Sequence, residues 1–165
     1  MTVDKVDVGN GRIVDYTHLK ASNFSVVFPV TPEGKIVCLL SYRHGPRCVN
    51  LTFPAGSIDS NENAREAAIR ELGEETRYRP RSMERLLNYP IWLDGNYGLS
   101  QGNFFIARDA VLDGDMLSYH NTDLEKSKVI LITEEELREY LNQGMVTISA
   151  HFICAIIGLS TISPS

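Results

Sequence analysis

Three glutamates at helical spacing, Glu71, Glu74 and Glu75, constrain this chain more than any other feature of its sequence. The segment around them, residues 64–76, repeats small or apolar side chains every four positions, which predicts a helix. On a helix, positions i, i+3 and i+4 share one face, so the three carboxylates lie together. They repel each other there, and the C-terminal half of a helix disfavours negative charge. Such a local conflict more often marks function than accident.

A divalent cation would relieve this repulsion. Clustered carboxylate oxygens on a helix suit Mg²⁺, or Mn²⁺ as an alternative, and these ions bridge to substrate phosphates. Arg70, four residues from both Glu66 and Glu74, can brace the carboxylates. An acidic helix face with arginine partners is also common on solvated surfaces, so the residue types alone leave both interpretations open. The glutamates at 134–136 provide a contrast, because they lie at a predicted helix N-terminus, where negative charge is favourable.

Size and charge limit the remaining possibilities. A chain of 165 residues, 43% of them apolar, can bury a core as one domain spanning residues 1–165. Its formal net charge of −5 gives no general attraction to nucleic acid or to anionic membranes, so neither is expected as a partner. The most apolar stretch, residues 146–162, contains His151 and is shorter than the roughly 20 residues of a membrane span, so it predicts a buried helix.

The cysteines and the first residues bear on the cellular compartment. Cys38, Cys48 and Cys154 are an odd number without metal-ligand spacing, and each lies beside apolar residues, which predicts reduced thiols in the core. Residues 1–12 carry charges where a signal peptide would need apolar side chains. We therefore expect a cytoplasmic protein.

Strands and helices are mixed along the chain. Two apolar runs, residues 25–30 and 36–42, flank a turn-forming segment that contains proline and glycine, and they predict a β-hairpin. Further elements are predicted as strands at 49–53, 86–93, 103–107 and 128–132, and as helices at 64–76, 133–142 and 149–159. Capping boxes are predicted at two helix starts, from the pairs Asn63 with Glu66 and Thr133 with Glu136. The pattern indicates one α/β domain.

The segment from residue 56 to residue 78 carries a specific pattern. Its fixed positions are Gly56, Glu62, Arg70, Glu71, Leu72, Glu74, Glu75 and Tyr78. In order and spacing it resembles the Nudix box, Gly-x5-Glu-x7-Arg-Glu-U-x-Glu-Glu-x-Gly-U, where U is an apolar or aromatic residue. The resemblance implies an α/β/α sandwich with a mixed β-sheet, and Mg²⁺-dependent hydrolysis of a nucleoside diphosphate linked to another moiety.

Residues outside the box resemble the ADP-ribose pyrophosphatase subgroup of this family. The resemblance covers about residues 12–160 and rests on Phe-Pro-Ala-Gly-Ser-Ile-Asp at 53–59, Ser-Tyr-Arg at 41–43, Gly-Leu-Ser at 98–100 and the segment 144–159. It implies that ADP-ribose or a related nucleotide sugar is cleaved to a nucleoside monophosphate and a sugar phosphate. Another nucleotide substrate (a dinucleotide, coenzyme A, a cap or an oxidised nucleotide) and a nucleotide-sensing module without catalysis are the alternatives.

The resemblance also implies roles in metal binding and catalysis. The metal ligands would be Glu71, Glu74, Glu75 and the main-chain carbonyl of Ala55. Arg70 would support these carboxylates from its place between them. The general base would be a carboxylate on a loop well after the box, Glu125 or Asp123, or else Glu74 itself.

Substrate contacts are expected from residues outside the box. Arg43 has a planar guanidinium that suits a phosphate, and Ser100 belongs to the loop that follows the box. Trp92 and Tyr97 could stack on a base, although a single tryptophan near a strand end is also common in a core. The four histidines show no metal-ligand spacing and receive no role.

Several positions depart from the family pattern. Arg77 stands where the box has a glycine that permits a left-handed helix end, so either the helix ends differently or Arg77 is strained. Thr52 stands where many members carry a glutamate linked with ligand recognition, and Asn96 with Tyr97 replaces a common Ser-Pro pair. The N-terminal region is short compared with members that build a swapped β-domain dimer from it. We expect a homodimer, but the short N-terminal region leaves open which surfaces form its interface.

Overall fold

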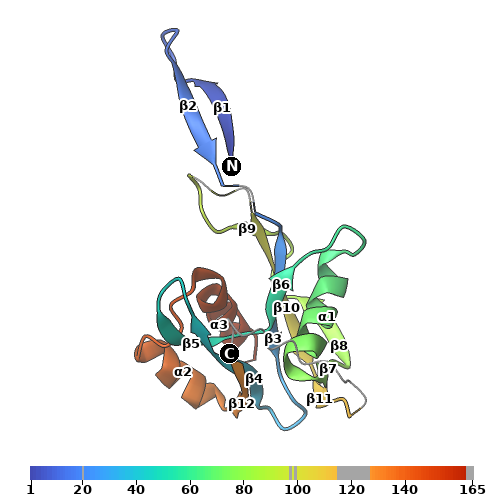
Figure 1. Cartoon of the computed structure of the whole chain (residues 1–165). Helices are drawn as coiled ribbons and strands as arrows, with labels where there is room; N and C mark the ends of the chain where they lie inside the picture. The colour runs from blue at the N-terminus through green and yellow to red at the C-terminus, as the bar shows by residue number, and fades with distance from the viewer. Residues whose placement is uncertain (20, 97, 99, 115–126, 163–165) are drawn as a thin grey trace.

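The computed structural model describes residues 1–19, 21–96, 98, 100–114 and 127–162 (Figure 1). Its strands are β1 (Thr2–Asp7), β2 (Ile13–His18), β3 (Phe24–Pro29), β4 (Ile36–Arg43), β5 (Cys48–Thr52), β6 (Ala55–Ser57), β7 (Tyr78–Arg79), β8 (Ser82–Arg85), β9 (Ile91–Trp92), β10 (Gln101–Arg108), β11 (Val111–Leu112) and β12 (Ser127–Ile132). Its helices are α1 (Ala64–Thr76), α2 (Glu134–Asn142) and α3 (Ser149–Ile162).

A mixed sheet forms the centre of the molecule, with strand order β6-β3-β10-β8 and with β9 also paired to β10. Strands β3 and β10 are parallel, and the other pairs are antiparallel. Side chains alternate across this sheet. Val26 and Phe28 pack with the buried face of α3, whereas Val27 packs with Ala68 and Leu72 of α1. The sheet therefore lies between two helices, in the α/β/α arrangement that the resemblance to the Nudix box implies (Figure 1).

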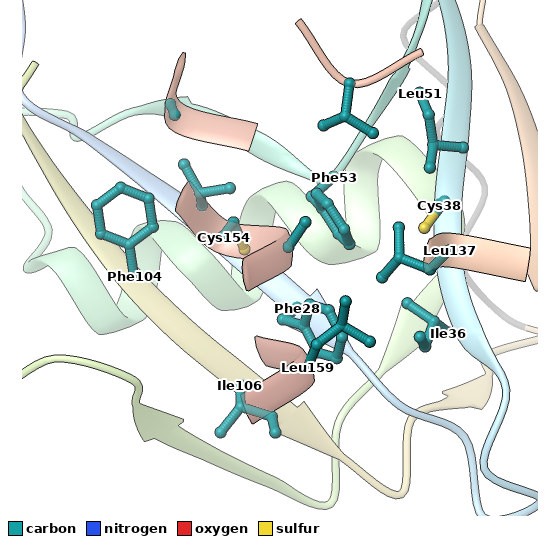
Figure 2. Packing of buried hydrophobic residues seen from close by; sticks show 14 of the residues in the cluster. Phe28, Ile36, Cys38, Leu51, Phe53, Phe104, Ile106, Leu137, Cys154 and Leu159 are labelled. Carbon is teal, nitrogen blue, oxygen red and sulfur yellow. The ribbon is translucent and has the colours of Figure 1, made fainter. Parts of the chain in front are cut away.

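A second sheet, of order β12-β4-β5, is antiparallel throughout. It contributes Cys38 and Leu51 to the main apolar cluster, which also contains Leu137 of α2 (Figure 2). Phe28 and Phe53 stack within this cluster, with ring centroids 5.4 Å apart. The core thus joins the two sheets to α2 and α3.

The predicted hairpin between residues 25–30 and 36–42 is wrong, because β3 and β4 belong to different sheets. The turn between them does form, since Thr31 donates its N–H to the carbonyl of Lys35. Beyond one isolated bridge between Val30 and Ile36, the strands separate. Each strand is apolar and buried along most of its length, so each can lie inside a sheet with a neighbour on both sides. The residues of the turn therefore do not by themselves determine which strands pair.

The predicted strand at 86–93 is also wrong in part. The structure has β8 before it and the two residues of β9 within it, and residues 86–90 lie outside any strand. Leu86 still donates its N–H to the carbonyl of Phe104, but the chain then leaves the sheet. Pro90, which has no N–H to donate, interrupts the run just before β9. The other predicted strands and all three helices are confirmed to within a few residues.

A hairpin of β1 and β2 stands away from the rest of the molecule (Figure 1). The sequence interpretation missed it, although the Asn10-Gly11 pair is a common turn signal. Gly9, Asn10 and Gly11 all have positive φ, of 97°, 55° and 70°. Every residue of β1 is exposed.

Two of the three cysteines lie in the core, as the sequence predicts. Cys38 and Cys154 are free and buried, and burial raises the pKa of both thiols. Cys48 is free but exposed, so its assignment to the core is wrong: β5 enters the core only from its third residue onward. None of the helices in the described residues has both the length and the apolar character needed to cross a membrane.

Candidate active site

Helix α1 begins and ends at well-defined residues. Asn63 accepts hydrogen bonds from the N–H groups of Arg65 and Glu66, and Glu66 accepts one from the N–H of Asn63 at 2.8 Å, which confirms the predicted capping box. The helix ends at Arg77, whose φ of 63° and ψ of 20° are left-handed, while its N–H donates to the carbonyl of Gly73. Of the two alternatives for Arg77, the strained backbone is the one observed.

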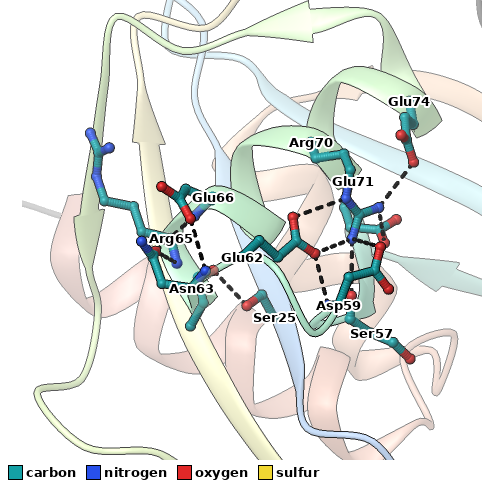
Figure 3. A network of polar contacts seen from close by, with 11 residues as sticks. Ser25, Ser57, Asp59, Glu62, Asn63, Arg65, Glu66, Arg70, Glu71 and Glu74 are labelled. Carbon is teal, nitrogen blue, oxygen red and sulfur yellow. Dashed lines mark hydrogen bonds and ion pairs between the residues drawn. The ribbon is translucent and has the colours of Figure 1, made fainter.

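Arg70 lies at the centre of a polar network that joins α1 to the loop before it (Figure 3). Its Nε and Nη2 donate to the two carboxylate oxygens of Glu62, at 3.1 and 2.7 Å. Its Nη2 also donates to the carbonyl of Ser57 at 3.0 Å. Its Nη1 donates to Glu71 at 2.7 Å and to Glu74 at 3.1 Å. One guanidinium thus holds three carboxylates and the loop backbone.

The carboxylate of Glu71 lies directly against Gly56 on β6. A Cβ at residue 56 would stand 2.0 Å from Oε1 of Glu71, so only glycine allows this approach. The Glu71 side chain is 14% exposed. Burial raises the pKa of Glu71, although the hydrogen bond from Arg70 acts in the opposite direction. The site therefore holds a carboxylate whose negative charge Arg70 only partly compensates.

The neighbouring acids face the same region from the next turn of α1. Glu75 accepts a hydrogen bond from the N–H of Ala55 at 2.9 Å. Glu74 is bound to Arg70 (Figure 3). Ala55 and Gly56, which are consecutive on β6, thus each contact one acid of the helix.

These oxygen donors fit a divalent cation in their chemistry. The carboxylates and the nearby main chain of β6 are the hard oxygen ligands that Mg²⁺ and Mn²⁺ take, and the incompletely compensated charge of Glu71 favours a cation. In the described part of the chain, no three acidic, histidine or cysteine side chains converge on one point in the way a bound metal needs. Glu71 and Glu74 are turned to Arg70, and Glu75 to the N–H of Ala55, so metal binding requires these side chains to reorient.

A cavity of about 410 Å³ opens on the other side of β6. Its wall includes both predicted substrate residues, Arg43 at the end of β4 and Ser100 just before β10. Among the described residues, the lining consists of Ala21, Ser22, Phe24, Val26, Arg43, Ala55, Gly56, Ser57, Leu93, Ser100, Ile148, Ala150 and His151. Strand β6 is therefore shared, with the acids against two of its residues and the cavity against all three.

Ser100 is already engaged within the protein. Its Oγ donates to the carbonyl of Ser22 at 2.6 Å, and the next residue, Gln101, donates its N–H to Asn23 at 2.9 Å. These bonds fix the two chain segments that border the cavity at this end. The hydroxyl proton of Ser100 is therefore already used, and toward a ligand this oxygen is left as an acceptor.

Two other residues singled out in the sequence, Trp92 and Thr52, do not line this cavity. Trp92 is half exposed on β9 and does not appear among the described residues of the lining. Thr52 is fully buried, with its Oγ1 3.3 Å from Oγ of Ser41 and bonded to the carbonyl of Leu39, so it too lies outside the lining. Tyr97, Asp123 and Glu125 lie outside the residues that the structure describes.

His151 is a polar residue of the cavity to which sequence reasoning gave no role. It lies in the first turn of α3 and accepts the N–H of Phe53 at Nδ1, at 3.1 Å. Burial, together with the nearby charge of Arg43, lowers the pKa of His151 to about 3, so the imidazole is neutral. The only signal in the sequence is a lone histidine in an otherwise apolar helix, and that pattern is compatible with any core position.

The chain is similar to a known protein family, to curated proteins and to solved structures. A family model described as NUDIX domain matches residues 19–152. The methanol dehydrogenase activator of Bacillus methanolicus is 33% identical over 89 residues, which cover 54% of this chain and 48% of that protein. The ADP-ribose pyrophosphatase of Bacillus subtilis (strain 168) is 30% identical over 84 residues, which cover 51% of this chain and 45% of that protein.

The similarity to the curated proteins covers only part of each chain, whereas the similarity to a solved structure covers nearly all of it. The chain spans about half the length of the curated relatives it matches. Among solved structures, an ADP compounds hydrolase superposes with a TM-score of 0.76 at 16% identity, covering 98% of this chain and 92% of that one. At this identity, the superposition shows a shared fold.

Proposed function

The chain belongs to the Nudix family, and we propose that it hydrolyses the pyrophosphate bond of a nucleoside diphosphate derivative, with ADP-ribose or a related nucleotide sugar as its substrate. The products would be a nucleoside monophosphate and a sugar phosphate. The names of two similar proteins, an ADP-ribose pyrophosphatase and an ADP compounds hydrolase, support this choice of substrate class.

Strand β6 carries this proposal, because its three residues separate the acids of α1 from the cavity. Glu71 lies against Gly56 and Glu75 is bonded to Ala55 on one side. On the other side, the same residues line a cavity large enough for part of a nucleotide and walled by Arg43. A pyrophosphate placed across β6 would have carboxylates at one end and a binding cavity at the other.

The acids would hold one or more divalent cations, with Mg²⁺ as the proposed ion. We assign Glu71, Glu74, Glu75 and the carbonyl of Ala55 as ligands. When bound, such ions neutralise phosphate charge and lower the pKa of water. Arg70 keeps the carboxylates of Glu71 and Glu74 next to each other, and Arg43 would bind a phosphate oxygen through its planar guanidinium, with Ser100 also in the cavity wall.

The general base has two candidate positions. Glu74 is on α1 beside Arg70, whereas Glu125 and Asp123 precede β12 in the sequence. Single substitutions to glutamine or asparagine separate them. Loss of the base lowers kcat and removes the acidic limb of the pH–rate profile, whereas loss of a ligand is partly rescued by raising the metal concentration.

A substrate panel with matched variants tests the proposed function. ADP-ribose, nucleotide sugars, dinucleotides and coenzyme A are each incubated with the wild type and Mg²⁺, and the products are separated. AMP and ribose 5-phosphate from ADP-ribose are the expected result. Glu71→Gln should lower the rate by roughly a hundredfold or more, and Glu135→Gln, exposed on α2, is the control. Tight nucleotide binding without turnover of any compound would show a sensing module instead.

We also propose that the protein is a homodimer joined through its N-terminal hairpin. Isolated two-stranded hairpins are marginally stable in water, and Val3, Val6 and Ile13 of this hairpin are exposed. A second copy packed on it would bury these side chains. Light scattering of Val6→Lys should give a monomer, while the wild type and Leu112→Lys, changed at an exposed site on β11, should remain dimers. A monomeric wild type would refute the assembly.

The free thiols bear on the proposed compartment. Cys38 and Cys154 are both reduced and buried in one apolar cluster. Thiols are kept in this state in reducing compartments, and we propose the cytoplasm as the site of action. Localisation of the tagged full chain by microscopy or fractionation tests this.

A further inference from the structure

His151 occupies a distinct position in the cavity beside β6. Its side chain is almost fully buried, with the residue only 6% exposed, yet it is part of the cavity wall. It reaches this wall from α3, while Arg43 reaches it from β4. The other wall residues are apolar or small, and none of the described ones carries a carboxylate.

The hydrogen bonding of the imidazole fixes which nitrogen carries its proton. Nδ1 accepts the N–H of Phe53, so in the neutral ring the proton is on Nε2. Within the described residues, this is the one hydrogen bond of the ring. Nε2 therefore has no partner among them, and it is not fully shielded from solvent. The Nε2–H group is therefore free to donate a hydrogen bond to an acceptor atom of a ligand.

The bond to Phe53 also gives the ring a fixed orientation. Phe53 stacks on His151 with ring centroids 6.5 Å apart, and Phe53 stacks on Phe28 in the core. A donor held in this way by a hydrogen bond and a ring contact loses little conformational entropy when a ligand binds. It also discriminates strongly, because a ligand without an acceptor would leave the buried N–H unpaired.

We infer that His151 is a specificity-determining residue that donates Nε2–H to an acceptor atom of the substrate group seated in this cavity, beside Arg43. The fitting ligand is a partly apolar group rich in acceptors and free of positive charge. Both a nucleoside monophosphate unit and a sugar phosphate unit carry such acceptors. The role given to His151 rests on the proposed function in taking this cavity as the substrate site.

The two ring nitrogens allow a matched pair of variants. In His151→Asn, the side-chain oxygen can take the place of Nδ1 and accept the N–H of Phe53, but the Nε2 donor is lost. In His151→Gln, the amide N–H₂ can take the place of Nε2, but the acceptor for Phe53 is lost. Phe152→Asn, on the exposed face of the same helical turn, controls for introducing asparagine there.

Kinetics and metal-free binding together test the inference. KM and kcat are measured with the best substrate of the panel, and calorimetry without metal measures Kd for AMP and for ribose 5-phosphate. We expect His151→Asn to raise KM at least tenfold with kcat changed less than threefold, and to raise Kd for only one of the two probes, which identifies the unit in the cavity. His151→Gln should recover at least threefold of the lost affinity, and Phe152→Asn should match the wild type.

Each contrary result has a definite meaning. A folded His151→Asn variant with wild-type KM and wild-type Kd for both probes overturns the inference. If His151→Asn does not fold, His151→Gln provides the test. A tenfold rise of KM and Kd in a folded His151→Gln variant would then overturn the inference. If the wild type turns over no compound, the proposed function fails, and the Kd comparison still tests the donor separately.

Discussion

Arg70 and Glu62 are joined by two parallel hydrogen bonds, from Nε to Oε2 at 3.1 Å and from Nη2 to Oε1 at 2.7 Å. Eight residues separate them in the sequence, so the pair closes the loop between β6 and α1 onto the helix (Figure 3). The hydrogen bonds from Arg70, together with one from the N–H of Asp59, lower the pKa of Glu62. The paired carboxylate thus stabilises the loop as long as it is ionised.

Glu62→Gln should lower the melting temperature at pH 7 because the charged pair is lost. A carboxyl whose pKa is lowered on folding contributes stability above its ordinary pKa of 4.5, and that contribution is lost as the pH falls through the folded value. The difference in melting temperature between wild type and variant should therefore be largest near pH 7 and shrink below pH 4.5. Glu135→Gln, at an exposed position, serves as control. A difference that does not change with pH would contradict this account.

Gly56→Ala should impair catalysis more than folding. The added methyl would stand 2.0 Å from Oε1 of Glu71, so the carboxylate must move away from β6. To reach ordinary van der Waals contact the carboxylate must move by about 1 Å or more, and a misplacement of about 1 Å at a reacting centre can cost roughly a hundredfold in rate. The methyl of Gly114→Ala would meet no atom of the described residues within 4 Å, and this variant should retain wild-type kcat/KM. Equal kcat/KM in the two variants would show that the position of Glu71 against Gly56 is unimportant.

Glu71→Gln should separate stability from metal binding. Because folding raises the pKa of Glu71, its ionised form is disfavoured in the folded state at pH 7, and the penalty disappears as the pH falls from the raised value to the ordinary 4.5. In metal-free buffer at pH 7, the variant should therefore melt at or above the wild-type temperature, with a smaller difference at pH 4.5.

Added Mg²⁺ should reverse that order. A ligand at a hundredfold excess over its Kd raises the melting temperature of a domain this size by roughly 5–10 °C. Only the wild type should show this rise. An equal rise in Glu71→Gln would remove Glu71 from the ligand set.

Arg77→Gly should stabilise the protein by about 0.5–1 kcal/mol. Arg77 has a φ of 63°, where a side chain is strained, and glycine relieves that strain at the cost of a more flexible unfolded chain. Chemical denaturation measures the difference. Arg81→Gly, at a residue without positive φ, should give no gain, and a gain there equal to that at Arg77 would contradict the explanation.

Gly158→Ala should destabilise the fold by about 1–3 kcal/mol. A Cβ at residue 158 would lie 2.2 Å from the ring of Phe28, so α3 would have to move away from β3. Ser160→Ala, on the exposed side of the same helix, should change stability little. Because His151 is on α3, the variant should also raise KM, which the steady-state kinetics would detect.

Local features of this fold are predictable from the sequence where one segment determines them alone. The bounds of α1 follow from Asn63 and Glu66 at one end and from the end of the apolar repeat at the other. The capping box of α2, from Thr133 and Glu136, is confirmed in the same way. Gly56 and Glu71, which contact each other, are both fixed positions of the Nudix box, so the sequence pattern contains both partners of this contact.

Features that depend on distant partners could not be read locally. The turn between β3 and β4 forms as expected, but the partners of these strands are β10, β6, β12 and β5, which no local pattern identifies. The contact of His151 with Phe53 joins residues 98 positions apart, so it has no signature in either segment. Cys48 lies beside apolar residues in sequence, but it precedes the part of β5 that enters the core.

The double use of β6 has a consequence for engineering. None of the described residues that line the cavity comes from α1, and none of the three acids on α1 lines the cavity. A library randomised at Leu93, Ile148 and Ala150 would therefore alter the size and polarity of the cavity while leaving the acids and Arg70 untouched. Such a library is the direct route from this scaffold to hydrolases with a changed substrate range.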